Sequence, residues 1–316
     1  MNGIHDFNMA NINGKEIKIT YNLAADYKFL MIILGLKASN SNFSCFLCKC
    51  HKDDFPFRIH SLLRNLDSES KTEFNFYGFE RKPLINFSMI PLDRIIICLL
   101  HLILRIFEFL CKDLIFQIVN LDRLKGCPIL SQHENIRAWI NFLEEIGINT
   151  YIKAYDEESM GGVTRDFTGS EILKILLKID LKKLFPKIKN VDEKKTTWDL
   201  FHKIIRVLSS GGAIIQFHFL EKILFEFSDK LEKFYVSKTL HKPYLHFLFN
   251  HLLDCILEIK DLSIYSQQGL EKLNDITTKE YFRASNKKYK TKNNFNYIKQ
   301  ILLRRIRIEF FETNNL

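Results

Sequence analysis

The pattern of apolar and polar positions predicts a chain that is mostly helical from about residue 94 onward. Apolar residues recur there every three to four positions, an interval that places them on one face of a helix. In 216–232 this stripe consists of Phe217, Leu220, Ile223, Leu224 and Phe227. The predicted helices cover 94–112, 136–146, 169–184, 197–208, 216–232, 243–259, 266–282 and 297–311.

Two local signals mark helix ends. Thr168, followed by Glu171 three residues later, is typical of the start of a helix and supports the helix over 169–184. Two serines and two glycines at 209–212 separate the helices before and after them.

The first part of the chain has a weaker, strand-like pattern. Residues 15–21 alternate charged and β-branched side chains, as in a half-buried strand, and 1–14 show no period and are expected to fray. An apolar run at 30–36 and a polar loop then lead to a cluster of cysteines at 45–51. The predicted fold class is α+β, predominantly α.

Composition supports a folded protein with a large core. The chain has 316 residues, 47% of them hydrophobic, and 28 are phenylalanines, which excludes a disordered chain. No repeat and no linker divides it. The apolar stretch at 95–111 is about 17 residues long, and it contains His101, Arg105 and Glu108. We therefore expect a buried helix there and no membrane partner.

The charge balance favours polyanions as partners. The formal net charge is +9, which favours nucleic acid first and anionic membranes second. An AT-rich genome enriches Lys, Asn, Ile and Phe together, so the charge alone decides little. The N-terminus has no basic-then-apolar signal pattern, and we expect an intracellular protein.

The seven cysteines indicate reduced thiols and a metal site. Their number is odd and three lie within six positions, which is not a disulfide framework. Cys45 and Cys48 form a C-x2-C pair that lets two thiolates reach one tetrahedral ion. His246 and His251, with four residues between them, fall within the spacing of zinc-binding histidine pairs.

From spacing alone the zinc site has alternatives. A C-x2-C pair also arises by coincidence, and histidines on an apolar helix are often satisfied core residues. His241 or Cys50 could replace a member of the set, whereas Cys50 and His51 follow Cys48 too closely to complete the site comfortably.

Two acidic residues are candidates for a second metal site. Asp26 follows the strand-like segment and Glu271 lies in a late predicted helix; carboxylates at such places can share Mg²⁺. Nothing in the residues alone prefers them to the other acids. From the residues alone, a solvated aspartate at a helix start and an exposed helical glutamate are the favoured interpretation.

The run YLHFLFNHLLDCILEIKDLSIYSQQGLEKLND resembles the end of the catalytic core of the V(D)J recombinase and its Transib transposase relatives. In that family a Tyr-x-His, four residues and a second His supply half a zinc site, and a turn then leads to the catalytic Glu and a following Asn. The matching residues here are His246, His251, Glu271 and Asn274. The step from His251 to Glu271 is 20 residues, similar to the family's.

A second, separate segment resembles the same family. There the second catalytic Asp precedes the C-x2-C pair by a short, fixed stretch. Asp26 precedes Cys45 by 19 residues in DYKFLMIILGLKASNSNFSCFLCKC. The resemblance is strongest over 20–51 and 241–290, and it is weaker in the segment between them.

The resemblance implies an RNase-H-like DDE site that holds two Mg²⁺ for DNA strand cleavage and transfer, with Asp26 and Glu271 as ligands. It implies a partial RNase-H-like element at 1–51, a large helical insertion at 52–240 and C-terminal helices at 241–316. A structural Zn²⁺ on the Cys2His2 set would close this fold, and DNA binding would place the protein in the nucleus. The implied phosphate contacts are Arg283, Lys287, Lys288, Lys290, Arg304 and Arg305, although a merely solvated basic face explains them equally well.

One departure limits the implied activity. The family's first catalytic Asp lies on an opening strand far upstream, and here Asp6 is too close to Asp26 and in the wrong setting. We therefore expect a transposon-derived protein that is inactive as an enzyme. The alternative is a non-catalytic, zinc-stabilised DNA-binding or scaffold protein, and a homodimer remains open.

Overall fold

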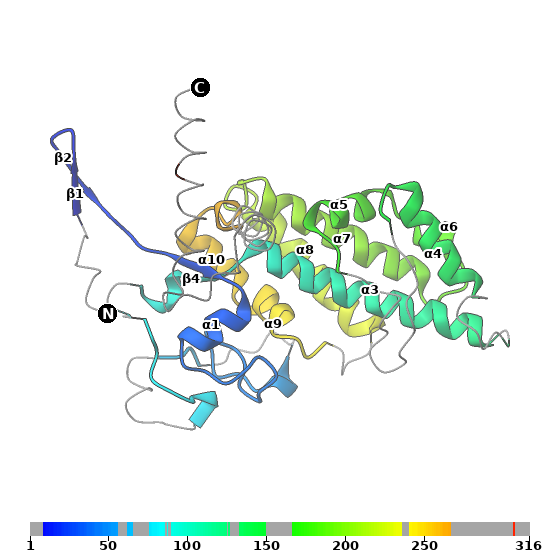
Figure 1. The fold of residues 1–316 in the computed structure, drawn as a ribbon, viewed down its shortest axis with the longest axis horizontal. Coiled ribbons are helices and arrows are strands. Elements are labelled where there is room, and N and C mark those ends of the chain that lie inside the picture. Colours follow the sequence, from blue (N-terminus) through cyan, green and yellow to red (C-terminus); the bar gives the residue numbers. More distant parts are fainter. Residues whose placement is uncertain are drawn as a thin grey trace, which may run out of the picture. The chain divides into compact units, whose positions relative to one another are not determined.

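The computed structural model describes residues 9–55, 62–65, 76–85, 87, 90–124, 126, 133–149, 166–235, 240–266 and 306. The chain separates into two compact units, Met1–Tyr265 and Ser266–Leu316. Apart from Ser266 and Ile306, the second unit lies outside the described residues, as do the helices predicted for 266–282 and 297–311. The first unit is mostly helical with a small two-sheet part, which confirms the predicted predominance of helix (Figure 1).

The first sheet is a hairpin of β1 (Met9–Ile12) and β2 (Lys15–Lys18), paired antiparallel. Asn13 and Gly14 connect the strands, both with positive φ (54° and 79°), the conformation that an Asn-Gly hairpin turn requires. The predictions for this segment were wrong in two respects. Part of the expected frayed lead-in is strand β1, and β2 is exposed along its length rather than half-buried. The Asn-Gly signal accounts for the extra strand.

The second sheet pairs β3 (Leu23–Ala25) with β4 (Ile95–Ile97) in parallel, although about 70 residues separate them in sequence. The helix predicted from residue 94 therefore begins too early. Its first residues form β4, after the short 3-10 turn η3 (Leu92–Arg94), and α3 starts at Leu99. Three consecutive isoleucines favour a buried strand, which apolar periodicity does not distinguish from a buried helix.

Helix α1 (Tyr27–Ile33) follows β3 directly. The carboxylate of Asp26 accepts a hydrogen bond from the Phe29 N–H at 2.9 Å and so caps the helix start. The helix ends before Gly35, where φ is +71° and an added Cβ would lie 2.0 Å from the Arg81 carbonyl oxygen. Only glycine fits this turn, which directs the chain toward the cysteine loop.

Helix α3 (Leu99–Leu124) lies at the centre of the helical part and packs against α4, α5, α7 and α9. Near its end the buried carboxylate of Asp122 accepts hydrogen bonds from the backbone N–H and side-chain amide of Asn135, at 3.0 and 2.8 Å. These bonds satisfy the start of α4 (Glu134–Glu145). A side chain of one helix thereby fixes where the next begins.

Helices α5 (Gly169–Lys178) and α6 (Leu181–Leu184) occupy the predicted 169–184, but as two helices. The predicted start is confirmed, because Thr168 and Glu171 form a reciprocal capping box. The break comes at Asp180, whose side chain accepts from the Lys183 N–H at 3.2 Å and caps α6 anew. Short 3-10 turns elsewhere are η1 (Lys52–Asp54), η2 (Phe76–Gly78) and η6 (Ser263–Tyr265).

Helices α7 (Val191–Ser209) and α8 (Phe217–Phe234) pack against each other, with Gly211 in a positive-φ turn between them. A buried ion pair links this layer to α3. The Lys194 ammonium lies 2.5 Å from the Asp113 carboxylate, and it also lies 3.8 Å from the centre of the Tyr235 ring. The pair lies where α3, α7 and the end of α8 meet.

Helices α9 (Pro243–Asn250) and α10 (Leu252–Ile259) take the place of the single helix predicted for 243–259. The chain leaves helical geometry at His251, where φ is −129° and ψ is −19°. Helix α9 packs against α3 and α8, so the histidines are held by the same core as the rest of the unit. Among the described residues, no helix has both the length and the apolar character needed to cross a membrane.

Candidate metal centre

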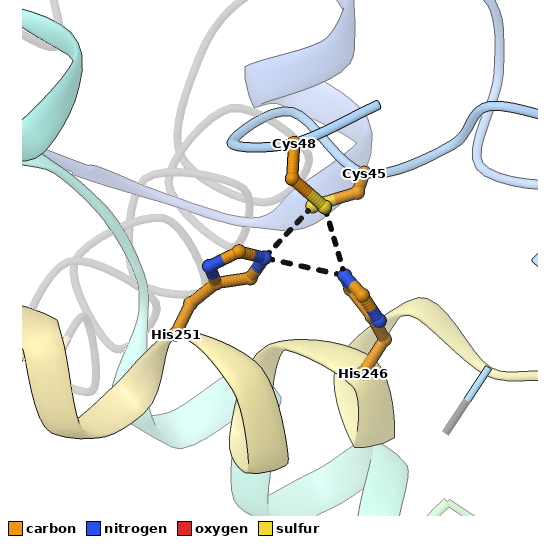
Figure 2. Close-up of side chains that lie close together, drawn as sticks. All are labelled: Cys45, Cys48, His246 and His251. Atoms are coloured by element: carbon orange, nitrogen blue, oxygen red, sulfur yellow. Dashed lines mark hydrogen bonds between the residues drawn. The ribbon is translucent and has the colours of Figure 1, made fainter. Parts of the chain in front are cut away.

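Four predicted ligands converge in the structure. Cys45, Cys48, His246 and His251 are all buried, and their ligand atoms lie within 4.8 Å of one another (Figure 2). Cys45 Sγ lies 3.4 Å from His251 Nε2, and Cys48 Sγ lies 3.2 Å from His246 Nε2. The two Nε2 atoms are 3.2 Å apart.

These distances match the edges of a zinc tetrahedron. Bond lengths of about 2.3 Å to sulfur and about 2.0 Å to nitrogen give sulfur–nitrogen edges of about 3.5 Å and a nitrogen–nitrogen edge of about 3.3 Å. Thiolate sulfur and imidazole nitrogen are the ligand atoms that Zn²⁺ prefers. The donor set and the geometry therefore fit one Zn²⁺ of the closed, structural type.

The cysteine loop is shaped by backbone contacts that sequence reasoning missed. The buried Arg64 donates from Nε to the Cys45 carbonyl at 2.7 Å and from Nη2 to the Phe43 carbonyl at 3.1 Å. The Tyr27 hydroxyl, on α1, donates to the Ser44 carbonyl at 2.6 Å. The Leu47 N–H points to Cys45 Sγ at 3.4 Å, as is common for a metal-bound thiolate. No spacing rule in the sequence would have identified Arg64.

The histidines are oriented by aromatic neighbours. The Phe55 ring stacks on the His246 imidazole at a centroid distance of 4.0 Å and an interplanar angle of 21°. Phe247 contacts the His251 ring. A stacked ring restricts rotation of the imidazole, so Nε2 of His246 stays directed at the cysteines.

The protonation chemistry of the four groups suits a divalent cation. Burial raises the pKa of Cys45 well above its usual range, whereas the hydrogen bond from Cys45, with those from His246 and His251, lowers the pKa of Cys48. Burial also lowers the pKa of His246, which keeps its imidazole neutral and able to donate a lone pair.

The alternative ligands lie outside this group. Cys50 is buried, but its thiol donates to the His51 carbonyl at 3.5 Å, and burial raises its pKa to about 12. The His51 side chain accepts from the Asp53 N–H at 3.3 Å and caps η1. His241 precedes α9 and is not one of the four converging residues. The set is Cys45, Cys48, His246 and His251.

Asp26 lies at the C-terminal end of β3, one residue before α1. Its Oδ1 is used as a helix cap, and the neighbouring Tyr27 N–H donates to the Tyr244 hydroxyl at 3.4 Å. Glu271, the other predicted Mg²⁺ ligand, lies outside the described residues. So do the predicted phosphate contacts Arg283, Lys287, Lys288, Lys290, Arg304 and Arg305.

Comparison with known proteins adds no relative. No protein-family model matches the chain, and no curated protein matches it.

Proposed function

We propose that this chain derives from the catalytic domain of a DDE-type DNA transposase, is closed by zinc, and keeps Asp26 as a metal ligand of the ancestral active site. One observation carries the proposal. Two segments about 200 residues apart each resemble the same family, and their Cys and His pairs lie in a single buried, zinc-compatible site. Coincidental motifs would not be expected to converge at ligand distance.

The surroundings of Asp26 support the same origin. It follows a strand that pairs in parallel with β4, and the helix it caps leads through Gly35 to the cysteine loop. In the family, the second catalytic Asp precedes the zinc pair by a short, fixed stretch. A partial RNase-H-like element at 1–51 is therefore part of the proposal.

The proposal assigns the metals different roles. Zn²⁺ on the four ligands would join the segment that carries Asp26 to the helices that precede Glu271. Mg²⁺, if bound by Asp26 and Glu271, would supply the Lewis acid for phosphodiester displacement. None of the chain's residues is assigned to the first catalytic Asp, so we expect this chain by itself to bind DNA without cleaving it.

A non-catalytic DNA-binding or scaffold protein is the second candidate. The observation in its favour is the cap, because one oxygen of Asp26 already has a structural role in α1. Under this alternative the zinc site stays and the carboxylates carry no chemistry.

The zinc site is tested by metal analysis of the purified chain. We expect one Zn²⁺ per chain, and Cys45→Ser should abolish it and lower the melting temperature. Cys111→Ser is the control, since Cys111 is equally buried but lies on α3 outside the cluster. A chain without zinc, or an unchanged stoichiometry in Cys45→Ser, would overturn the proposal.

The transposase origin is tested by Mg²⁺ binding to the purified chain, measured by titration. Asp26→Asn keeps a good helix cap but removes a carboxylate ligand, and Asp26→Ala removes both. If Asp26 is a metal ligand, both substitutions should weaken Mg²⁺ binding equally. If Asp26 is only a helix cap, Mg²⁺ binding should be unchanged in Asp26→Asn, which would favour the second candidate.

A further inference from the structure

The segment 173–190 concentrates positive charge in a small part of the chain. It contains six lysines and one acid, Asp180, which is a net charge of +5 in a chain whose total is +9. All six lysines are exposed. We define them as the α5–α6 basic edge; its members are Lys174, Lys178, Lys182, Lys183, Lys187 and Lys189.

The edge is held rigidly by the core. Leu181, Phe185 and Ile188 are buried, and the lysines between them are exposed, so the apolar residues fix the backbone while the ammonium groups face solvent. Backbone hydrogen bonds from Phe185 N to Leu181 O (2.8 Å) and from Ile188 N to Phe185 O (3.2 Å) continue the turn after α6. The backbone that carries these lysines is therefore held in place by the core.

Its charge is largely uncompensated. Lys182 pairs with Asp192 at 3.0 Å, but no carboxylate among the described residues forms an ion pair with the other five lysines. Lys174 and Lys178 lie four residues apart on one helix face, where like charges repel. In the same unit three half-buried or exposed lysines, Lys112, Lys195 and Lys233, do pair with acids, namely Glu108, Asp199 and Asp229.

We infer that the α5–α6 basic edge is a second nucleic-acid contact, which binds the phosphate backbone of duplex DNA without reading its sequence. Lysine ammonium groups are point charges that neutralise phosphates, and no base-reading geometry is required. An anionic membrane fits less well. The exposed apolar residues of the segment, Leu173 and Leu177, are confined to α5, whereas four of the six lysines follow it. The choice of DNA rests on the proposed function.

The test measures DNA affinity against salt for the full, zinc-loaded chain. The probe is a duplex of about 30 base pairs with no chosen sequence. In the triple variant Lys183→Gln, Lys187→Gln, Lys189→Gln, the slope of log affinity against log salt should fall by about 2 to 3, because each phosphate contact contributes about 0.9. The matched control changes the acid-paired Lys112, Lys195 and Lys233 to Gln and should leave the slope nearly unchanged.

The remaining outcomes separate this inference from the proposed function. A triple variant that binds DNA with the wild-type affinity and slope would overturn the basic edge. If DNA binding is weakened only by substitution of Lys287, Lys288 and Lys290, the proposed function is kept and the basic edge is not a DNA contact. If the triple variant lost binding to phosphatidylserine vesicles but bound DNA as the wild type does, DNA would be the wrong partner for the basic edge. If the triple variant has the zinc content and melting temperature of the wild type, the substitutions have altered only the surface.

Discussion

At the scale of single residues, the site depends on side chains that no motif contains. Arg64 bonds two carbonyls of the cysteine loop, and Phe55 stacks on His246. The four ligands were predictable because zinc imposes short, recognisable spacings on cysteines and histidines. Their supporting residues follow from the packed backbone alone, so they appear only once the loop is folded.

The first residue-scale prediction concerns Arg64. Replacing it with Met should leave the Cys45 and Phe43 carbonyls without a donor in a buried setting, and destabilise the chain by about 1 to 3 kcal/mol. Zinc affinity should weaken by about 10-fold or more, as for other groups that orient metal ligands. A competition titration with a zinc-binding dye measures this. Arg81→Met is the control, because Arg81 is exposed and bonds the Ile32 carbonyl instead.

The second prediction separates the structural role of Asp26 from any chemistry. Asp26→Ala should lower the free energy of unfolding by about 1 kcal/mol, because the Phe29 N–H loses its acceptor. Asp26→Asn should cost much less, since asparagine caps helices as well as aspartate does. Denaturant unfolding of both variants gives the answer. Equal losses would contradict the capping role.

At the scale of helices and strands, local signals predicted where elements lie better than where they break. Thr168 and Glu171 gave the start of α5 correctly, because a capping box acts within one turn. The strand Ile95–Ile97 depends on a contact with a distant segment: β4 exists because β3 pairs with it. Apolar spacing contains no information about such partners.

The element-scale prediction concerns the ion pair between α3 and α7. Lys194→Met should destabilise the chain by about 3 to 5 kcal/mol, because Asp113 is then buried without a counter-charge. The double variant Lys194→Met, Asp113→Leu should recover much of this loss. Thermal or denaturant unfolding measures both, and a double variant no more stable than Lys194→Met would contradict it.

The loss in Lys194→Met should depend on pH with a definite sign. Burial is the main cause that raises the pKa of Asp113 above its usual value, and removing Lys194 removes a group that lowers it. A carboxyl whose pKa is higher in the folded chain than in the unfolded chain favours the folded state while it is protonated. This contribution to the free energy of unfolding is fully present below the unfolded-state pKa of about 4, and it is lost as the pH rises through the folded-state pKa. The variant should therefore approach wild-type stability in acid and differ most near neutral pH.

At the scale of the whole molecule, the predominance of helix and the zinc site were predictable, whereas the arrangement of strands was not. The metal would join residues about 200 positions apart, and closing a loop of that length in the unfolded chain is worth about 5 kcal/mol in the chain-entropy picture. Removal of zinc with a chelator should accordingly lower the melting temperature strongly. The control is Cys45→Ser, whose melting temperature the chelator should change little. An equal fall in the melting temperature of the wild type and of Cys45→Ser would argue against the zinc site.

The break between α9 and α10 has a consequence for how the two histidines can serve one ion. In an unbroken α-helix successive residues turn by about 100°, so two histidines five positions apart would point about 140° away from each other. His246 and His251 meet only because the chain departs from helical geometry at His251. The break in the helix, and not helical periodicity, therefore lets two histidines from adjacent helices face one ion. A chain that ran on as one helix through His251 would carry the same two residues without offering a paired site.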